Sequence, residues 1–187
     1  MEYNKETIKN FIELLSSTNS MPGGGVGVAL VGAIATSLTL KVCNLSIGKE
    51  RYKENEEMIK SVAKELELLK TNFLELMDKD AEDFKYMEIV YKMPKSTDDE
   101  KLKRNSEMLI ASKKCCEAPT LVIINLKKLI RLIDMLDGKS NVSAHSDLVI
   151  AKILSESSIK SSYENLNINF ANIADESFKN SIREKLL

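Results

Sequence analysis

Apolar residues recur every three or four positions along most of this chain, which is the spacing of an amphipathic α-helix. The longest stripe predicts one helix from about 53 to 91 and runs through Met58, Val62, Leu66, Leu69, Phe73, Leu76, Asp80, Phe84, Met87 and Tyr91. Strand-like alternation is scarce, and the 187 residues include only 3 prolines and 7 glycines. The pattern therefore predicts an all-α fold, a helical bundle with long amphipathic helices.

The rest of the pattern predicts shorter helices on either side of this one. They are expected over 5–15, from about 97 to 136 with an interruption at Pro119, over 144–172 and from 175 to the C-terminus. Apolar residues share one face of the first of them, namely Ile8, Phe11, Ile12 and Leu15. Ser143 and Asp175 are expected to cap the last two, because their side-chain oxygens can accept hydrogen bonds from a first helical turn.

A glycine-led stretch from Pro22 to Leu40 predicts a central helix with very little side-chain bulk on one face. Its small residues are Gly27, Ala29, Gly32, Ala33, Ala35 and Ser37. Two interpretations are open: close packing inside a bundle, or an anion site at the N-terminus, where unpaired N–H groups and the helix dipole favour negative charge. The apolar run stops at Lys41, short of the roughly 20 residues that a bilayer requires, so no membrane partner is expected.

Length and composition fit one domain spanning residues 1–187. The 27 lysines and arginines nearly balance the 28 aspartates and glutamates, so no nucleic-acid partner is expected. The first ten residues lack the pattern of a secretory signal, so the protein is expected in the cytoplasm. Cys43, Cys115 and Cys116 are expected to be reduced core thiols, and a zinc site of nitrogen and sulfur ligands is not expected beside a single histidine.

Asp80 is the candidate catalytic residue, because it interrupts the apolar stripe of the long helix. Leu76 lies one turn before it and Phe84 one turn after it, so its carboxylate is expected to face the interior, whereas Asp78 lies about 160° away around the helix. Burial would raise its pKa towards the range of a general base or acid. The alternatives are an internal pair with a lysine or arginine, or a wet groove. His145 is expected to be a solvated or capping residue.

Several motifs, in order along the chain, resemble the cyclodeaminase/cyclohydrolase family acting on tetrahydrofolate. They are the PGGG-led helix at Pro22, the pair Lys49 and Tyr52, DxDAxxF at 78–84, Pro94-Lys95, Ser146-Asp147 and the asparagine-rich stretch 165–169. The resemblance spans nearly the whole chain. It departs from the family at Val26, where serine is common, and at His145, where a small residue is common.

The resemblance implies an all-α bundle that forms a homodimer with active sites at or near the subunit contact. It implies a tetrahydrofolate derivative as substrate and no metal. Members either hydrolyse 5,10-methenyltetrahydrofolate to the 10-formyl form, or close 5-formiminotetrahydrofolate to the methenyl form with loss of ammonia. Hydrolysis is the preferred reaction because no formiminotransferase region accompanies these motifs. The alternatives are the cyclodeaminase reaction and a non-catalytic folate-binding or helical scaffold protein.

The resemblance also suggests roles for particular residues. Asp80 would act as the general base or proton shuttle beside the reacting carbon. The glutamate tail of the folate would be held by a set of backbone and cationic groups at Pro22, Gly23, Gly24, Gly25, Lys49, Lys95 and Arg104. Ser146 and Asp147 would bind the substrate, with Asp147 pairing with donor groups on the pterin. From its residue type alone, Tyr52 is expected either to stack on a flat ligand or to pack half-buried at a helix end.

Overall fold

The computed structural model describes residues 2–187, and throughout that range the chain forms helices and connecting turns, without a strand. The predicted all-α fold is therefore confirmed. The elements are η1 (Tyr3–Lys5), α1 (Ile8–Leu15), α2 (Gly24–Ser46), η2 (Glu50–Asn55), α3 (Glu56–Tyr91), α4 (Asp98–Cys115), α5 (Glu117–Leu136), η3 (Val142–Ala144), α6 (His145–Phe170) and α7 (Glu176–Lys185).

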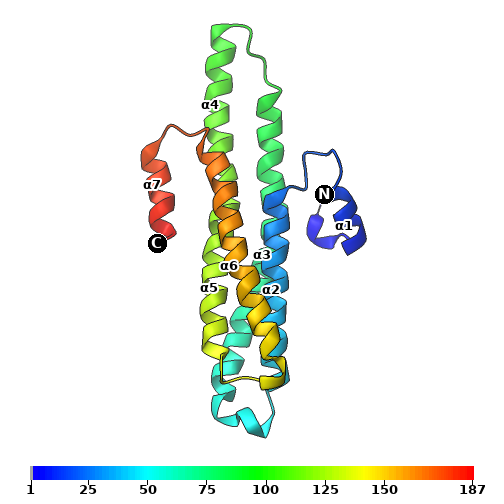
Figure 1. The fold of residues 1–187 in the computed structure, drawn as a ribbon. Helices are drawn as coiled ribbons and strands as arrows, with labels where there is room; N and C mark the ends of the chain where they lie inside the picture. Colours follow the sequence, from blue (N-terminus) through cyan, green and yellow to red (C-terminus); the bar gives the residue numbers. More distant parts are fainter. Residues whose placement is uncertain (1) are drawn as a thin grey trace.

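The bundle is elongated, and its long helices run along one axis (Figure 1). Helix α2 contacts α3, α5 and α6. The end of α3 and the start of α4 form a hairpin that projects beyond the other helices, while α1 and α7 flank the bundle on opposite sides (Figure 1). Helices α4 and α5 follow one another with a single intervening residue, Cys116, so Pro119 lies in the first turn of α5, where its missing N–H costs no hydrogen bond.

The small residues of α2 allow close packing inside this chain. A methyl group on Gly32 would lie 2.6 Å from a ring carbon of Phe73 on α3, which is closer than carbon atoms pack. Ala29 and Ala35 are fully buried. Among residues 2–187, α2 is the one helix long and apolar enough to cross a bilayer. Within the apolar 18-residue window of this helix, 56% is buried inside the bundle. Packing thus accounts for much of its apolar character.

The long helix α3 largely follows the predicted stripe. Val62, Leu66 and Phe73 are buried, whereas Tyr91 at the end of the stripe is exposed and the preceding Val90 is buried. The predicted start of the next helix is also confirmed, because Thr97 and Glu100 form a reciprocal capping box. Asp175 caps α7 by accepting the N–H of Phe178 at 3.0 Å, as predicted.

Two local predictions are wrong. The first helix begins at Ile8, after a separate 3-10 turn, and of its predicted apolar face only Phe11 is buried, while Ile8 remains 85% exposed. Ser143 does not cap α6, because it lies inside the turn η3 and its N–H donates to the Asn141 side chain at 2.9 Å. The side-chain cap on this segment is therefore Asn141, two residues earlier.

Candidate active site

The carboxylate of Asp80 on α3 lies against the first turn of α2. A methyl group on Gly25 would lie 2.4 Å from both carboxylate oxygens, so only glycine permits this approach. Gly23, the N-cap of α2, has no side chain to satisfy the first free N–H groups. Asp80 serves in its place, since its carboxylate accepts the N–H of Val26. The glycine-led helix start and the aspartate of the long helix therefore form one site.

Burial dominates the electrostatics of Asp80. Desolvation is the largest cause that raises its pKa, and the nearby carboxylate of Asp83 raises it further. Hydrogen bonds from the Asn165 side chain and the Val26 N–H stabilise the ionised form and lower the pKa. The opposing effects leave the pKa of Asp80 at about 6, against an ordinary value of 3.8. Asp80 is therefore ionised at neutral pH yet basic enough to take a proton.

Two asparagines of α6 complete this side of the site. Asn165 faces Asp80, and its amide nitrogen would lie 2.6 Å from a methyl group on Gly25. Asn169, one turn further on, donates to the carbonyl of Cys115 at 2.7 Å, which satisfies a free carbonyl at the end of α4. The sequence signal for Asn165 was its place on the inner face of α6, between Ser162 and Asn169, but sequence reasoning gave it no role in the site.

Asp83, one turn after Asp80, is a second carboxylate that sequence reasoning missed. Its side chain is only 13% exposed, and desolvation raises its pKa. Lys79 lies with Nζ 3.1 Å from Asp83 and 2.9 Å from Glu117 on α5. The signal that could have identified Asp83 is its spacing of three residues from Asp80, which places both on one face of the helix.

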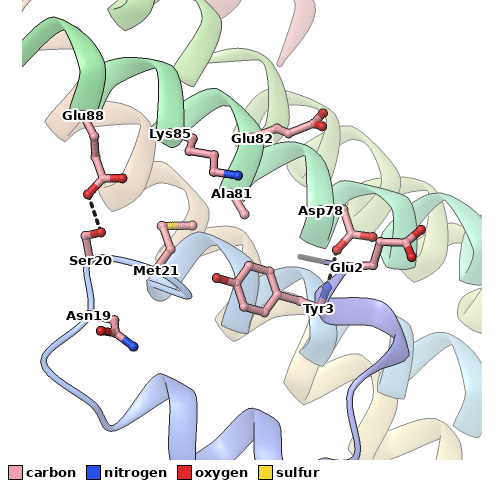
Figure 2. A pocket seen from close by; sticks show the side chains of 10 residues that line it. All are labelled: Glu2, Tyr3, Asn19, Ser20, Met21, Asp78, Ala81, Glu82, Lys85 and Glu88. Carbon is pink, nitrogen blue, oxygen red and sulfur yellow. Dashed lines mark hydrogen bonds between the residues drawn. The ribbon is translucent and has the colours of Figure 1, made fainter.

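A cavity of about 500 Å³ lies on a different face of α3 (Figure 2). The α3 residues that line it are Asp78, Ala81, Glu82, Lys85 and Glu88, and Asp80 is not among them. Asp78 accepts the N–H of Tyr3 at 2.6 Å, which fastens the N-terminal turn to α3. The separation predicted for Asp78 and Asp80 is therefore confirmed. This cavity lies between the N-terminal segment and α3, and the carboxylate of Asp80 is outside it.

His145 and the cysteines show the environments expected of them. His145 begins α6, is exposed, and has Nδ1 3.5 Å from Asp137 Oδ1. Cys43, Cys115 and Cys116 are free and buried, and desolvation raises the pKa of each thiol to about 12. In the part of the chain that the structure describes, no three His, Cys, Asp or Glu side chains gather in a way that could hold a metal ion.

Comparison with known proteins gives the same answer as the motifs. Residues 7–187 match the Formiminotransferase-cyclodeaminase family. The chain belongs to this family. It is 31% identical over 173 residues to methenyltetrahydrofolate cyclohydrolase of Methylorubrum extorquens, covering 92% of this chain and 83% of that protein. It is 28% identical over 170 residues to formimidoyltransferase-cyclodeaminase of Gallus gallus, of which it spans only 31%.

A solved structure of the family has the same fold. Formiminotetrahydrofolate cyclodeaminase from Thermotoga maritima superposes with a TM-score of 0.88 at 26% identity, covering 99% of this chain and 88% of that one. Both sequence and fold therefore place the whole bundle, including Asp80 and Gly25, within the formiminotransferase-cyclodeaminase family.

The residues that the family motifs single out lie in three places on the bundle. Pro22, Gly23, Gly24 and Gly25 lie at or just before the first turn of α2, beside Asp80. Lys95 is exposed in the turn that links α3 to α4, and Arg104 lies on α4 in the same projecting hairpin. Eleven residues separate Asp80 from the end of α3, so this hairpin turn begins roughly 16 Å from the carboxylate.

The remaining motif residues lie at the far end of α2. Tyr52 accepts the N–H of Val142 at 3.1 Å through its hydroxyl, next to exposed Lys49. Asp147, beside exposed Ser146 at the start of α6, pairs with Lys41 Nζ at 2.8 Å. Helix α2 is 23 residues long, or roughly 34 Å, so these four residues and Asp80 do not surround one small molecule within a single chain.

Proposed function

We propose that this protein is a tetrahydrofolate one-carbon enzyme that hydrolyses 5,10-methenyltetrahydrofolate to 10-formyltetrahydrofolate. The observation that carries the proposal is the environment of Asp80, a partly buried carboxylate with a pKa of about 6 at the start of α2. Family membership supports the folate substrate. The relative from Methylorubrum extorquens, which this chain matches over most of both lengths, supports hydrolysis as the reaction.

Asp80 has two roles in the proposed mechanism. The methenyl carbon lies between N5 and N10 in a cationic amidinium, so the adjacent carboxylate stabilises the bound cation. The carboxylate also removes a proton from the attacking water, which forms the new carbon–oxygen bond. The carbon–N5 bond then breaks, one water proton ends on N5, and the other leaves to solvent. Asn165 and the Val26 N–H hold the carboxylate in position for both roles.

The second candidate reaction is cyclodeamination of 5-formiminotetrahydrofolate. The structural relative from Thermotoga maritima carries that name. Here Asp80 would move a proton from N10, as it attacks the formimino carbon, to the departing amine. The two reactions need one carboxylate in the same place, so the geometry around Asp80 fits both.

Absorbance separates the two reactions, because methenyltetrahydrofolate has a strong near-ultraviolet band. We expect enzyme-dependent loss of this band from methenyltetrahydrofolate, faster than the loss without enzyme. Appearance of the band from 5-formiminotetrahydrofolate, with release of ammonia, would replace hydrolysis by cyclodeamination. No change with either substrate, despite binding, would reject both and leave a folate-binding protein without turnover.

The glutamate tail of the substrate is proposed to run from the α2 N-terminus towards the projecting hairpin. The free N–H groups of the first turn, at Gly24 and Gly25, offer an anion site. Lys95 and Arg104 lie further along in the hairpin, and the buried Nε of Arg104 has no hydrogen-bond partner among residues 2–187. No metal is needed for either reaction, and the three buried free cysteines support a cytoplasmic enzyme.

A homodimer is proposed to complete the site. An apolar groove between α2 and α3 is lined by Leu30, Ile34, Leu38 and Leu74. Towards the C-terminal end of α2 it reaches Lys41, which pairs with Asp147. A second copy could cover this groove in an antiparallel orientation. The end of that copy that carries Tyr52 and Asp147 would then lie towards Asp80 of the first copy. This arrangement would reconcile the family motifs with their separation in one chain.

Mixing two inactive variants tests this arrangement. Asp80→Asn and Asp147→Ala should each be nearly inactive alone, and a mixture that exchanges subunits should regain roughly a quarter of the wild-type activity. A hybrid dimer would then contain one intact site and one doubly altered site. Failure to regain activity despite verified subunit exchange would place Asp80 and Asp147 in separate sites.

A further inference from the structure

The hydrolysis proposed above releases one proton in each turnover, and Asp80 is the first group to hold it. Asp80 is enclosed by Gly25, Val26 and Asn165, none of which can carry a proton to solvent. The base must lose its proton before the next water can be activated. A second titratable group beside Asp80 is therefore significant.

Asp83 has the geometry of such a group. It lies one helical turn from Asp80, close enough for its charge to act on it, and both act on the thiol of Cys115. Its Oδ2 is buried and, within residues 2–187, accepts no hydrogen bond, although Lys79 Nζ lies 3.1 Å away as an ion-pair partner. Burial disfavours the ionised form of Asp83 more than this ion pair favours it, because the pKa of Asp83 is raised overall, so the buried carboxylate is costly for stability.

Exposure increases stepwise beyond Asp83. The side chain of Asp83 is 13% exposed, that of Lys79 is 35% exposed, and that of Glu117 is 57% exposed. Lys79 bridges the two carboxylates, at 3.1 Å from Asp83 and 2.9 Å from Glu117. A charged path thus leads from the neighbourhood of Asp80 to the surface beside α5.

The charged and titratable groups that act on this pair come from three helices. They are Lys79 on α3, Lys114 and Cys115 on α4, and Glu117 on α5. Helices α2 and α6 contribute the neutral Val26 N–H and the Asn165 amide. Burial is the largest cause that raises the pKa of Asp83, and Glu117 raises it further, whereas the two lysines favour the ionised form and lower it.

We propose that Asp83 is a positioning residue that acts through Asp80, receiving the proton that Asp80 takes from water and releasing it to solvent at the exposed edge formed by Lys79 and Glu117. The Lys79 ammonium stays protonated and favours the ionised form of Asp83 that can receive the next proton. The proposal rests on the hydrolytic function proposed above. No bond other than those to the moving proton is made or broken in this step. In the reverse sense, the same path would supply the proton that cyclodeamination consumes when ammonia leaves as ammonium.

The test is the Asp83→Asn variant assayed in weak and in strong buffer. In weak buffer its kcat should fall about tenfold, less than the roughly hundred-fold minimum expected for loss of the general base itself. Concentrated imidazole, a small proton carrier, should restore most of that loss, whereas the wild type should not respond. Removal of the neighbouring negative charge should also move the acid limb of kcat/KM to lower pH by roughly one pH unit.

The control is Glu82→Gln, an exposed position on the same helix, which should match the wild type in kcat, in pH profile and in its indifference to imidazole. Asp83→Glu should retain the wild-type buffer independence. If Asp83→Asn does not fold, Lys79→Met takes its place. Without the lysine cation Asp83 stays protonated and cannot receive a proton, so the same imidazole rescue is expected.

The outcomes separate this proposal from the proposed function. An Asp83→Asn variant with wild-type kcat in weak buffer and an unmoved acid limb overturns the proton path while the hydrolase assignment stands. A loss of activity that imidazole does not restore assigns Asp83 a structural role only and also overturns the path. A wild-type protein with no folate turnover removes the hydrolase assignment, and the path with it.

Discussion

Replacing Asp80 by asparagine should lower kcat/KM for methenyltetrahydrofolate hydrolysis by roughly 100- to 10,000-fold, the range expected for loss of a general base. Asparagine has nearly the same volume and can still accept the Val26 N–H, so the start of α2 should keep its geometry. What it cannot do is take a proton or offset the charge of the amidinium. Substrate affinity should therefore fall together with the rate. A variant with near wild-type turnover would exclude Asp80 as the base.

The pH dependence of the wild type follows from the same carboxylate. Because the pKa of Asp80 is raised to about 6, activity should fall as the pH drops through that value and the base becomes protonated. Binding of the cationic substrate should lower that pKa, so the acid limb of kcat should lie below that of kcat/KM. Steady-state rates between pH 5 and 8 measure both limbs.

The same replacement should stabilise the folded protein at neutral pH. A folded-state pKa above the ordinary 3.8 means that the ionised form is disfavoured by folding. Wild-type stability then falls as the pH rises from about 4 to about 6 and stays level above that. Asp80→Asn escapes this loss, and we expect it to be more stable at pH 7.5 by on the order of 2 kcal/mol, with a smaller difference at pH 5.

Urea unfolding at the two pH values measures the difference. Glu82→Gln is the matched control, because Glu82 is exposed on the face away from Asp80. Asp78 would be a poor control, since it accepts the Tyr3 N–H and its replacement would release the N-terminal turn. An Asp80→Asn variant less stable than the wild type at pH 7.5 would mean that the hydrogen bonds outweigh desolvation.

Sequence periodicity predicted the long helices well because their burial is set by residues on the same helix. The stripe through Phe73 and Leu76 on α3 is buried as expected, and Asp80 lies on it. The prediction was wrong at α1, where an amphipathic pattern exists but the segment packs beside the bundle and leaves Ile8 exposed. Periodicity reports that a face is apolar, and it does not report whether a partner helix covers that face.

The candidate site was predictable only in part, because its parts meet through tertiary packing. Asp80 was identified by its place on an apolar stripe, and the glycines by their composition. The contact between Gly25 and Asp80 joins positions 55 residues apart on different helices, and no pattern within one helix encodes it. Asn165 was missed for a related reason, since it gains its role from Asp80 on another helix. Asp83 was missed although its spacing of three residues from Asp80 on the same helix could have identified it.

That contact leads to the second large expected effect: Gly25→Ala should abolish most activity without unfolding the protein. The added methyl would lie 2.4 Å from both Asp80 oxygens and 2.6 Å from the Asn165 amide nitrogen. These atoms are ends of side chains that can rotate away, and the backbone at Gly25 is helical, so alanine suits it. Displacement of a catalytic carboxylate by about 1 Å can cost on the order of 100-fold in rate.

Gly27→Ala is the control for this substitution. It lies on the same helix two residues further on, and a methyl group there meets no atom within 4 Å. It should keep full activity and gain stability of roughly 0.5–1 kcal/mol, because alanine favours the helix interior over glycine. Gly25→Ala should resemble it in thermal unfolding and differ from it in kcat. If both variants retain wild-type kcat, the close approach of Asp80 to the start of α2 is not needed for catalysis, and the base must act from another position.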